Sequence, residues 1–378
     1  MKVVDRYLVL LFVKVLVVCF VSLVGLFIVI DLFANLDELW SYGKRHEGGF
    51  LMVVAEYYGP RCLQFFDKTA GMLAMIAVVF VITLLQRTNE LTALMAAGVP
   101  RSRVMLPLLV AAAAVSWLGV ANREFGLPAV RGSLASNAQD WLGERARKCT
   151  PRYDLRTDIL ISGKATRAKN RQIEDPQFRL PVELAAWDRQ IAAAAAFAQP
   201  ASADHPAGFL LRGVKQPKNL GQLPSQSLDG QVVLYSPADT PWLAADECFV
   251  VSVVTFEQLA VGGAWRNYLS SNELITGLRG RTLEPGADVR VTLHARLVQP
   301  LLDFSLVLLG LPLVLTRGSR NIFLAAGLCG TVVAALYFVV FTCHGLGSNY
   351  LLDPTLAAWV PLVIFGPVAF TWSRPLWD

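Results

Sequence analysis

The stretch TNELTALMAAGVP, Thr88 to Pro100, is a polar-flanked helix pattern set between two long apolar runs. Apolar or small residues recur in it at the i, i+3, i+4 and i+7 spacing of one helix face: Leu91, Leu94, Met95 and Gly98. Asn89 suits the start of a helix, and Gly98 followed by Pro100 is a stop signal. The pattern therefore predicts a short helix at about residues 88–98.

Arginines flank this helix closely, at positions 87, 101 and 103. Basic residues in short loops mark the cytoplasmic side of a membrane protein, so the helix is expected in the cytoplasm. No soluble domain of the chain is available there to cover its apolar stripe, which points to a groove on another protein. The alternative is a helix lying on the inner leaflet. We favour protein contact because several of its residues are small and offer few membrane anchors: Ala93, Ala96, Ala97 and Gly98.

Composition places the chain between a soluble domain and a fully embedded bundle. The chain has 378 residues, of which 54% are hydrophobic. The apolar residues crowd the first and last thirds, whereas residues 123–290 resemble a water-soluble domain. The net charge of +5 comes largely from arginines at the expected cytoplasmic edge, so it gives no indication of nucleic acid as a partner.

Hydropathy predicts a multi-pass helical membrane protein. A spanning helix needs roughly 20 mostly apolar residues. Six stretches qualify: residues 7–33, 65–85, 104–121, 297–315, 322–343 and 354–372. The first is too long for the apolar core of a signal peptide and has no small-residue cleavage site after it, so we interpret it as a retained anchor.

Loop charges predict the direction of each span. Basic residues fall on one side of the predicted bundle: Lys2, Arg6, Arg87, Arg101, Arg103, Arg317, Arg320 and Arg374. The opposite loop at residues 345–353 has no lysine or arginine. Both termini are therefore expected in the cytoplasm. The exceptions are basic residues at the expected outer surface, and these are candidate contacts for lipid phosphates or acidic sugars: Lys44, Arg45, Arg61, Lys68 and Arg123. The alternatives are solvation or pairing with nearby carboxylates such as Asp67.

The segment at residues 123–296 is then exported and patterned as a β-domain. Short strands are predicted at residues 155–162, 178–182, 191–198, 209–214, 231–235 and 249–256, separated by turn residues. The alanines at 192–196 also suit a helix. Such spacing favours a sandwich or jelly-roll-like fold. Cys149 and Cys248 could form a disulfide if this domain faces an oxidising compartment.

Enzyme motifs are missing from the sequence. It contains no G-x-x-x-x-G-K-[ST] nucleotide loop, no H-E-x-x-H and no G-x-S-x-G, and its six cysteines lack metal-ligand spacing. We expect no catalytic residues, no metal and no cofactor in this chain.

Several motifs taken in order resemble one family. They are Asp5-Arg6-Tyr7, DLFANLDEL at 31–39, NELTALMAAGV at 89–99, NREFGLP at 122–128, LSSNELI at 269–275, LHARLVQP at 293–300 and GLPL at 310–313. Together with the six-span plan around one exported domain, they resemble the LptF/LptG permease family of the lipopolysaccharide export system, without separating its two members. Two positions depart from the family pattern: Met95 replaces a common basic residue, and Asp67-Lys68 replaces an uncharged span entry.

The resemblance implies a fold and an assembly. It implies an α-helical membrane protein of six transmembrane helices with an inserted periplasmic all-β jelly-roll-like domain, divided at residues 1–122, 123–296 and 297–378. The implied partners are a homologous six-span permease, a cytoplasmic ABC ATPase dimer that hydrolyses ATP, a periplasmic jelly-roll bridge and lipopolysaccharide. A different ABC-type exporter, a mechanotransmission permease or a non-transporting membrane scaffold is the alternative.

The resemblance also implies roles for particular residues. Residues 88–98 become the helix that couples the permease to the ATPase, through Glu90, Leu91, Ala93, Leu94, Ala97 and Gly98. The family's lateral gates involve the first and fifth spans, where the aromatic candidates for lipid contact are Phe20, Phe27, Phe323, Tyr337, Phe338 and Phe341. Packing on other helices is the alternative for each of these aromatic residues. Asp303 in the fourth span could line the cavity or pair with Arg296 or Arg123.

Overall fold

The computed structural model describes residues 3–45, 47–134, 145–202, 205–228, 230–280, 286–315 and 322–374. The chain divides into two compact units, one formed by Met1–Ala129 with Gly286–Asp378 and the other by Val130–Pro285. The helical unit thus extends past the boundaries of 122 and 297 suggested by hydropathy. The third span continues through a π-helical turn at Asn122–Gly126 into α6 (Leu127–Ala129), and the fourth begins ten residues before its apolar core.

The helical unit is built from long helices with short connections. Its main elements are α1 (Val3–Ala34), α2 (Leu36–Gly43), α3 (Gly49–Arg87), α4 (Glu90–Ala96), α5 (Arg101–Ala121), α10 (Ala287–Leu315), α11 (Ile322–Ser348) and α12 (Pro354–Trp372). Within the described residues, six of these are long and apolar enough to cross a membrane: α1, α3, α5, α10, α11 and α12. The predicted spans are confirmed, and the helices exceed their apolar cores by up to sixteen residues, as in α3, which begins at Gly49 instead of residue 65.

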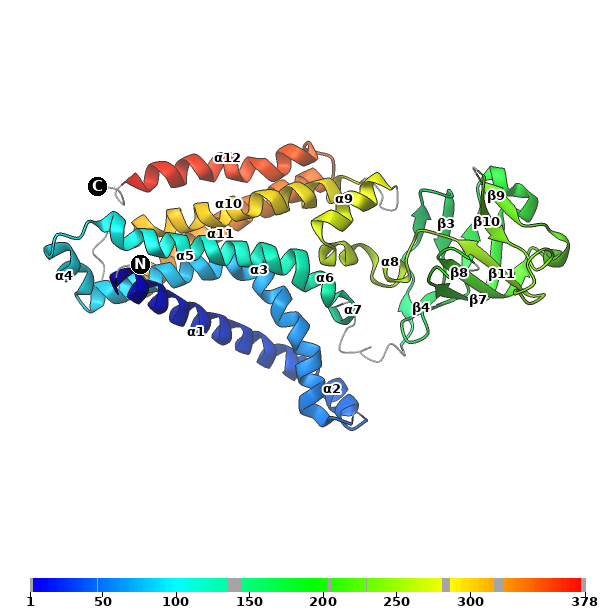
Figure 1. The fold of residues 1–378 in the computed structure, drawn as a ribbon, viewed down its shortest axis with the longest axis horizontal. Helices are drawn as coiled ribbons and strands as arrows, with labels where there is room; N and C mark the ends of the chain where they lie inside the picture. The colour runs from blue at the N-terminus through cyan, green and yellow to red at the C-terminus, as the bar shows by residue number, and fades with distance from the viewer. Residues whose placement is uncertain are drawn as a thin grey trace. The chain divides into compact units, whose positions relative to one another are not determined.

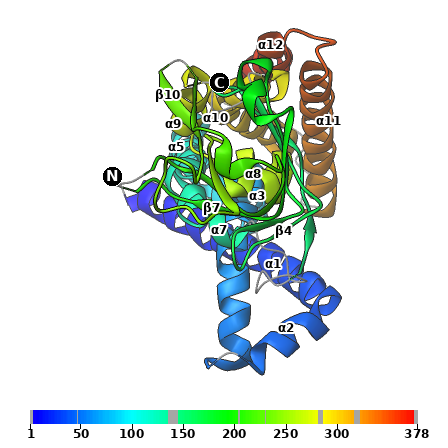
Figure 2. The same cartoon turned by 90° about the vertical axis from the view of Figure 1, so that its right-hand side faces the viewer.

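Helix α3 lies at the centre of the membrane core. It packs against α1, α5 and α10, while α11 contacts α10, α12 and α3 (Figure 2). Small residues let these helices approach closely, as is usual between helices in membranes. A Cβ at Gly310 of α10 would lie 3.0 Å from the Met75 side chain of α3. By contrast, α1 keeps only a few side chains buried: Leu8, Phe12 and Val24.

One end of the helical unit carries α4 together with both chain ends. Figure 1 shows the start of α1, the carboxyl end of α12 and α4 at the same end, and α2 at the other. The basic residues at helix ends gather at the α4 end: Arg6 in α1, Arg87 closing α3, Arg101 opening α5 and Arg374 after α12. Lys2, Arg317 and Arg320 lie outside the described residues.

The second unit is an all-antiparallel β-domain. Its described strands are β1 (Arg147–Lys148), β2 (Arg152–Asp154), β3 (Ile159–Ser162), β4 (Ala165–Arg167), β5 (Gln172–Glu174), β6 (Gln177–Arg179), β7 (Gln190–Gln199), β8 (Gly208–Gln216), β9 (Gln226–Leu228), β10 (Gln231–Tyr235) and β11 (Glu247–Val251). Short helices flank them at α7 (Arg131–Leu134), α8 (Phe256–Val261) and α9 (Ser271–Arg279).

The long strand β7 organises the sheet. One edge of β7 pairs with β8, and the other edge pairs with β6 near Ile191 and with β5 near Ala196. The main path runs β1-β4-β5-β7-β8-β11-β10-β9, with β6, β3 and β2 forming a branch. The core between them includes the fully buried Trp187, Phe178 and Phe209. A helical membrane protein with an inserted all-β domain is therefore confirmed.

Several strand boundaries differ from the predicted ones. The alanine-rich segment is a strand, because each end of β7 has a partner on both edges. The predicted strand at 249–256 ends at Val251, since Thr255 and Gln258 form a capping box that starts α8 at Phe256. The predicted strands at 155–162 and 178–182 shrink to β3 and β6.

Candidate functional site

Helix α4 is a single seven-residue helix with defined ends. Asn89 precedes it in the left-handed conformation (φ 59°), and Gly98 follows it at φ 78°. The Gly98 amide donates to the Met95 carbonyl at 3.0 Å, and the Val99 amide donates to the Leu94 carbonyl at 3.1 Å. This pair of bonds is a Schellman motif, which explains why glycine stands at 98.

The two faces of α4 have different partners. Leu91 is only 6% exposed and belongs to the core of the spans, and Leu94 and Val99 pack against the same core. The opposite face is exposed at Ala93, Met95, Ala96, Ala97 and Gly98. The predicted stripe is therefore divided. Leu91 and Leu94 pack α4 on its own bundle, whereas Met95 and Gly98 stay exposed together with the alanines.

A hydrogen bond ties α4 to the first span. The Tyr7 hydroxyl donates to the Glu90 carboxylate at 2.9 Å. Glu90 stands in the first turn of α4, where a negative charge also suits the helix dipole. Sequence reasoning named Glu90 but missed Tyr7, which lies 83 residues away and was noted only within the Asp5-Arg6-Tyr7 motif. Movement of α4 is thereby linked to the start of α1.

The predicted outer cations do not form one cluster. Lys44 and Arg45 are exposed just after α2, where the Lys44 Nζ lies 5.9 Å from the centre of the Trp40 ring. Arg61 lies over the Tyr57 ring, 3.4 Å from its centre, and donates to the Tyr57 carbonyl. Lys68 is exposed two helical turns further along α3.

Arg123 is the one predicted cation that the structure draws into the bundle. Its Nε lies 2.8 Å from Asp67 Oδ1, and both side chains are about 85% buried, with exposures of 14% and 15%. This pair joins α3 to the π-helical turn after α5. The charged Asp67 in an apolar span, noted above as a departure from the family pattern, is thus the partner of Arg123.

Asp303 lies close to this pair on α10. It is 6% exposed and accepts a hydrogen bond from Gln299 at 3.0 Å. Gly71 of α3 provides its space, because a Cβ there would lie 2.2 Å from Asp303 Oδ1. The charges of Arg123 and Asp67 both act on Asp303. Polar side chains of α3, α10 and the π-helical turn thus lie together inside the helical unit: Asp67, Asp303 and Arg123. The partner seen for Asp303 is Gln299, whereas pairing with Arg296 or Arg123 was expected.

The aromatic candidates fall into two groups. Phe20 and Phe27 of α1 pack on aromatic rings of α3, with centroid distances of 5.7 Å to Phe66 and to Phe65 respectively. On α11, Tyr337 packs against the core, whereas Phe338 and Phe341 are 70% and 80% exposed. The side chain of Phe323 lies outside the described residues. Exposed phenylalanines on α11 are free to meet lipid or another helix.

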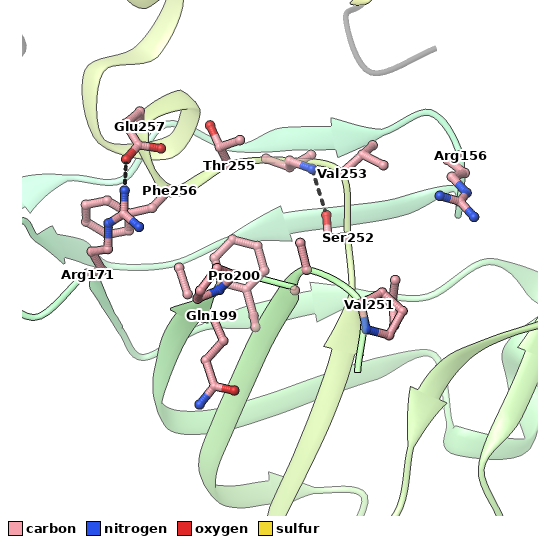
Figure 3. A pocket seen from close by; sticks show the side chains of 16 residues that line it. Arg156, Arg171, Gln199, Pro200, Val251, Ser252, Val253, Thr255, Phe256 and Glu257 are labelled. Atoms are coloured by element: carbon pink, nitrogen blue, oxygen red, sulfur yellow. Dashed lines mark hydrogen bonds and ion pairs between the residues drawn. The ribbon is translucent and has the colours of Figure 1, made fainter. Parts of the chain in front are cut away.

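The β-domain contains a cavity of about 450 Å³ at the ends of β7, β8 and β11. Figure 3 shows Arg156 on one side of it and the Arg171–Glu257 ion pair on the other. Between them the wall is mixed: it includes the apolar Phe209 and Val251 and the polar Gln199, Ser252 and Thr255. The strand ends are held by the buried Asp154, which accepts hydrogen bonds from the Ser252 hydroxyl and the Val253 amide.

Cys149 and Cys248 are buried free thiols, so the structure contains no disulfide between them. Burial raises the pKa of the Cys149 thiol to about 11, against a backbone hydrogen bond with Gly163 that lowers it. Within the described residues, no group of three or more metal-ligating side chains is present.

Six membrane-length helices, one inserted β-domain and a short helix anchored at the end of the bundle define the class as a multi-pass helical membrane protein. Compared with protein families, residues 6–164 and 207–375 match the model described as lipopolysaccharide export system permease LptF/LptG. The chain belongs to this family of inner-membrane transporter components. A comparison with curated proteins gave no match. The unmatched residues 165–206 include β5, β6 and β7, so this part of the β-domain departs from the family model.

Proposed function

We propose that this permease draws lipopolysaccharide or a related glycolipid from the inner membrane, driven by a separate ABC ATPase dimer. In this proposal both termini and α4 lie in the cytoplasm, and the β-domain lies in the periplasm. The chain pairs with a homologous six-span permease, and its β-domain passes the lipid to a periplasmic jelly-roll bridge. Hydrolysis of ATP belongs to the partner, since the sequence has no nucleotide-binding loop.

The construction of α4 carries this proposal. A seven-residue helix is too short to be stable alone, yet α4 is capped at its end and fixed to the bundle through Leu91. Its outward face of small residues allows close approach of a partner backbone. A push on that face is transmitted through Leu91 to the spans and through the Tyr7–Glu90 bond to α1.

The geometry favours this role over a helix lying on the inner leaflet. A membrane-lying helix buries its large apolar side chains in lipid. In α4, Leu91 and Leu94 are directed into the protein, and the exposed face has Met95 as its single large apolar side chain. The exposed alanines Ala93, Ala96 and Ala97 give little area for lipid insertion.

Charge and apolar surface at the other end of the spans support a lipid substrate. Lys44, Arg45 and Lys68 are exposed there and suit phosphates or acidic sugars. The exposed Phe338 and Phe341 of α11 suit acyl chains or the first span of the partner permease. In the β-domain, the 450 Å³ cavity combines the cation Arg156 with apolar lining residues such as Phe209 and Val251, and an amphiphile has groups that suit both.

Purification of the intact complex from membranes in mild detergent tests the proposal. Mass spectrometry of the co-purified proteins and lipids is expected to find an ABC ATPase, a second six-span chain and a phosphorylated glycolipid. A membrane scaffold would bring down periplasmic proteins without an ATPase. A different exporter would bring down an ATPase with another lipid. Hydrolysis of ATP by the purified chain alone would contradict the proposal.

A further inference from the structure

The sheet of the β-domain has a second face, opposite the one that covers the core described above. Along β11, alternate residues belong to different clusters: Val250 lies in that core, whereas Phe249 and Val251 form part of a smaller cluster. Tyr235 of β10 packs against the smaller cluster. Both β10 and β11 pair with a neighbouring strand on each edge. A molecule bound to this face therefore contacts side chains instead of a free strand edge.

Three aromatic rings surround Phe249 on this face. The ring centres of His205, Trp242 and Tyr235 lie 4.4, 5.7 and 6.0 Å from that of Phe249. Phe249 itself is fully buried, whereas Trp242 is 39% exposed, and Tyr235 and His205 are half-buried. The three outer rings form an aromatic platform, defined by His205, Tyr235 and Trp242, whose surface is open to a ligand.

A second cavity of about 450 Å³ lies beside the platform and is lined by Tyr235 and Arg156. Arg156 also lines the first cavity, so this cation is shared by the two. Within the described residues its exposed side chain has no ion-pair partner, whereas Arg171 is paired with Glu257 (Figure 3). Thr157, also in the lining, is 3% exposed and its hydroxyl has no described hydrogen-bond partner. Such groups are usually satisfied by water or a ligand.

The chemistry of these residues fits an acidic saccharide. A sugar ring has a face of C–H groups that packs on aromatic rings such as Trp242 and Tyr235. Its hydroxyls donate and accept hydrogen bonds, which suits the Tyr235 hydroxyl and the amide of Gln231 in the second cavity. A phosphate or carboxylate on the sugar forms charge-assisted hydrogen bonds with Arg156. An acyl chain would use none of these polar groups.

We propose that this face of the β-domain binds the acidic saccharide of the transported glycolipid. A sugar ring lies on Trp242 and Tyr235, and its phosphate or carboxylate lies at Arg156. This inference rests on the proposed function and assigns the sugar part of the substrate to a particular surface. That surface is the face of the sheet that points away from the core of the β-domain.

Binding of soluble saccharides to the full-length chain in detergent tests the site. The main probe is a fluorescently labelled, phosphorylated oligosaccharide released from lipopolysaccharide by mild acid, which carries no acyl chain. Neutral maltohexaose and a muramic-acid fragment of cell-wall glycan carry the same label. Fluorescence anisotropy gives the dissociation constant of each probe. We expect the phosphorylated probe to bind most tightly, about ten-fold more tightly than maltohexaose, because a phosphate carries more negative charge than a single carboxylate.

Variants separate the charge from the platform. Arg156→Gln should weaken binding of the phosphorylated probe about ten-fold and leave maltohexaose unchanged, because only the charge-assisted bond is lost. Arg179→Gln, at an exposed position of β6 outside both cavities, is the matched control and should change neither. Trp242→Leu should weaken both probes several-fold, and Trp242→Phe, which keeps a smaller ring, should weaken them less. Tyr153→Leu removes another exposed aromatic side chain of the β-domain and should have no effect.

Three results would overturn the proposal. One is the absence of saturable binding of the phosphorylated probe to the folded wild type. Another is an equal loss in Arg156→Gln and Arg179→Gln, which would indicate general surface charge. The third is tighter binding of the muramic-acid fragment, which would assign the site to cell-wall glycan. These assays need neither ATPase nor transport, so their failure leaves the proposed transport function standing. Conversely, a purified complex without an ATPase would remove the transport proposal and leave the measured dissociation constants valid.

Discussion

Replacing Leu91 by alanine tests whether α4 must be rigidly attached to the spans. Leu91 is 6% exposed and belongs to the hydrophobic core of the helical unit, while the rest of α4 is largely exposed. The substitution keeps the outward face of α4, the Tyr7–Glu90 bond and the glycine at 98. It removes the more deeply buried of the two leucine side chains, Leu91 and Leu94, that pack α4 against the bundle.

The size of the effect follows from burial. Removing a buried leucine side chain costs about 2–5 kcal/mol through lost transfer energy and the cavity that remains. Because α4 lies at the end of the bundle and the site can partly collapse, we expect about 3 kcal/mol. A change of 1.4 kcal/mol is a factor of ten, so the attached state of α4 should lose about 100-fold in population relative to detached states.

The assay measures transport and hydrolysis together. The complex is reconstituted in vesicles. The amount of lipid delivered to a periplasmic acceptor is then divided by the amount of ATP hydrolysed in the same time. We expect Leu91→Ala to lower this ratio at least ten-fold while the ATPase still co-purifies, because its docking face is intact. Leu118→Ala is the matched control: the same substitution on α5 at a side chain that is 59% exposed should leave the ratio unchanged.

An unchanged ratio in Leu91→Ala, with the variant complex assembled and folded, would refute rigid transmission through α4. An equal loss in Leu118→Ala would instead show that the assay reports general damage to the bundle. Loss of ATPase co-purification in Leu91→Ala alone would mean that Leu91 contributes to docking itself.

Four other perturbations have defined outcomes. Glu90→Lys breaks the bond to Tyr7 and should abolish transport-coupled ATPase activity in vesicles while the complex still assembles; unchanged turnover would count against it. Gly98→Val places a β-branched residue at φ 78° and should lower the thermal midpoint by a few degrees, at a cost of about 1–2 kcal/mol, as measured by scanning fluorimetry. Asp67→Asn frees Arg123 and should raise glycolipid co-purification several-fold if Arg123 binds headgroups, whereas Arg123→Gln should lower it; equal yields would remove Arg123 from the site. Burial keeps the Cys149 thiol protonated up to a pKa of about 11, whereas in the unfolded chain it loses its proton near pH 9. The free energy of unfolding should therefore be highest below about pH 9 and fall as the pH rises toward 11, so that less denaturant unfolds the protein. The fall should be smaller in Cys149→Ser.

The membrane plan could be predicted from sequence because its signal is local. A spanning helix is recognised from about 20 consecutive apolar residues, and all six predicted spans are helices. Their true ends were less accessible. The first part of α3 and the first turns of α10 contain charged residues, such as Glu56 and Arg290, that the apolar window rejects.

The β-domain was predictable in class but not in detail. The long strand β8 matches a predicted strand, whereas the alanines of β7 also suited a helix. Strands β1, β4 and β5 have two or three residues each and are defined only by their partners. Pairing between residues far apart in the sequence sets these short strands, and no local period encodes it.

The candidate site shows the same division. The helix predicted at 88–98 and its stop at Gly98 follow from local spacing, and the structure has α4 at Glu90–Ala96. Which face of the helix points outward does not, because Leu91 is buried in the core of the spans, where α4 packs against α3. The Arg123–Asp67 pair also depends on tertiary structure, since 56 residues separate its members.

Photo-cross-linking from Ala96 in intact cells tests most directly whether α4 contacts the ATPase that is proposed to drive the permease. A cross-linking amino acid at this exposed position of α4 is predicted to form a covalent adduct with a cytoplasmic ABC ATPase. The same probe at Leu118, an exposed position near the other end of α5, should not. Adducts confined to periplasmic proteins, or labelling of residue 96 by reagents that reach only the periplasm, would contradict the account.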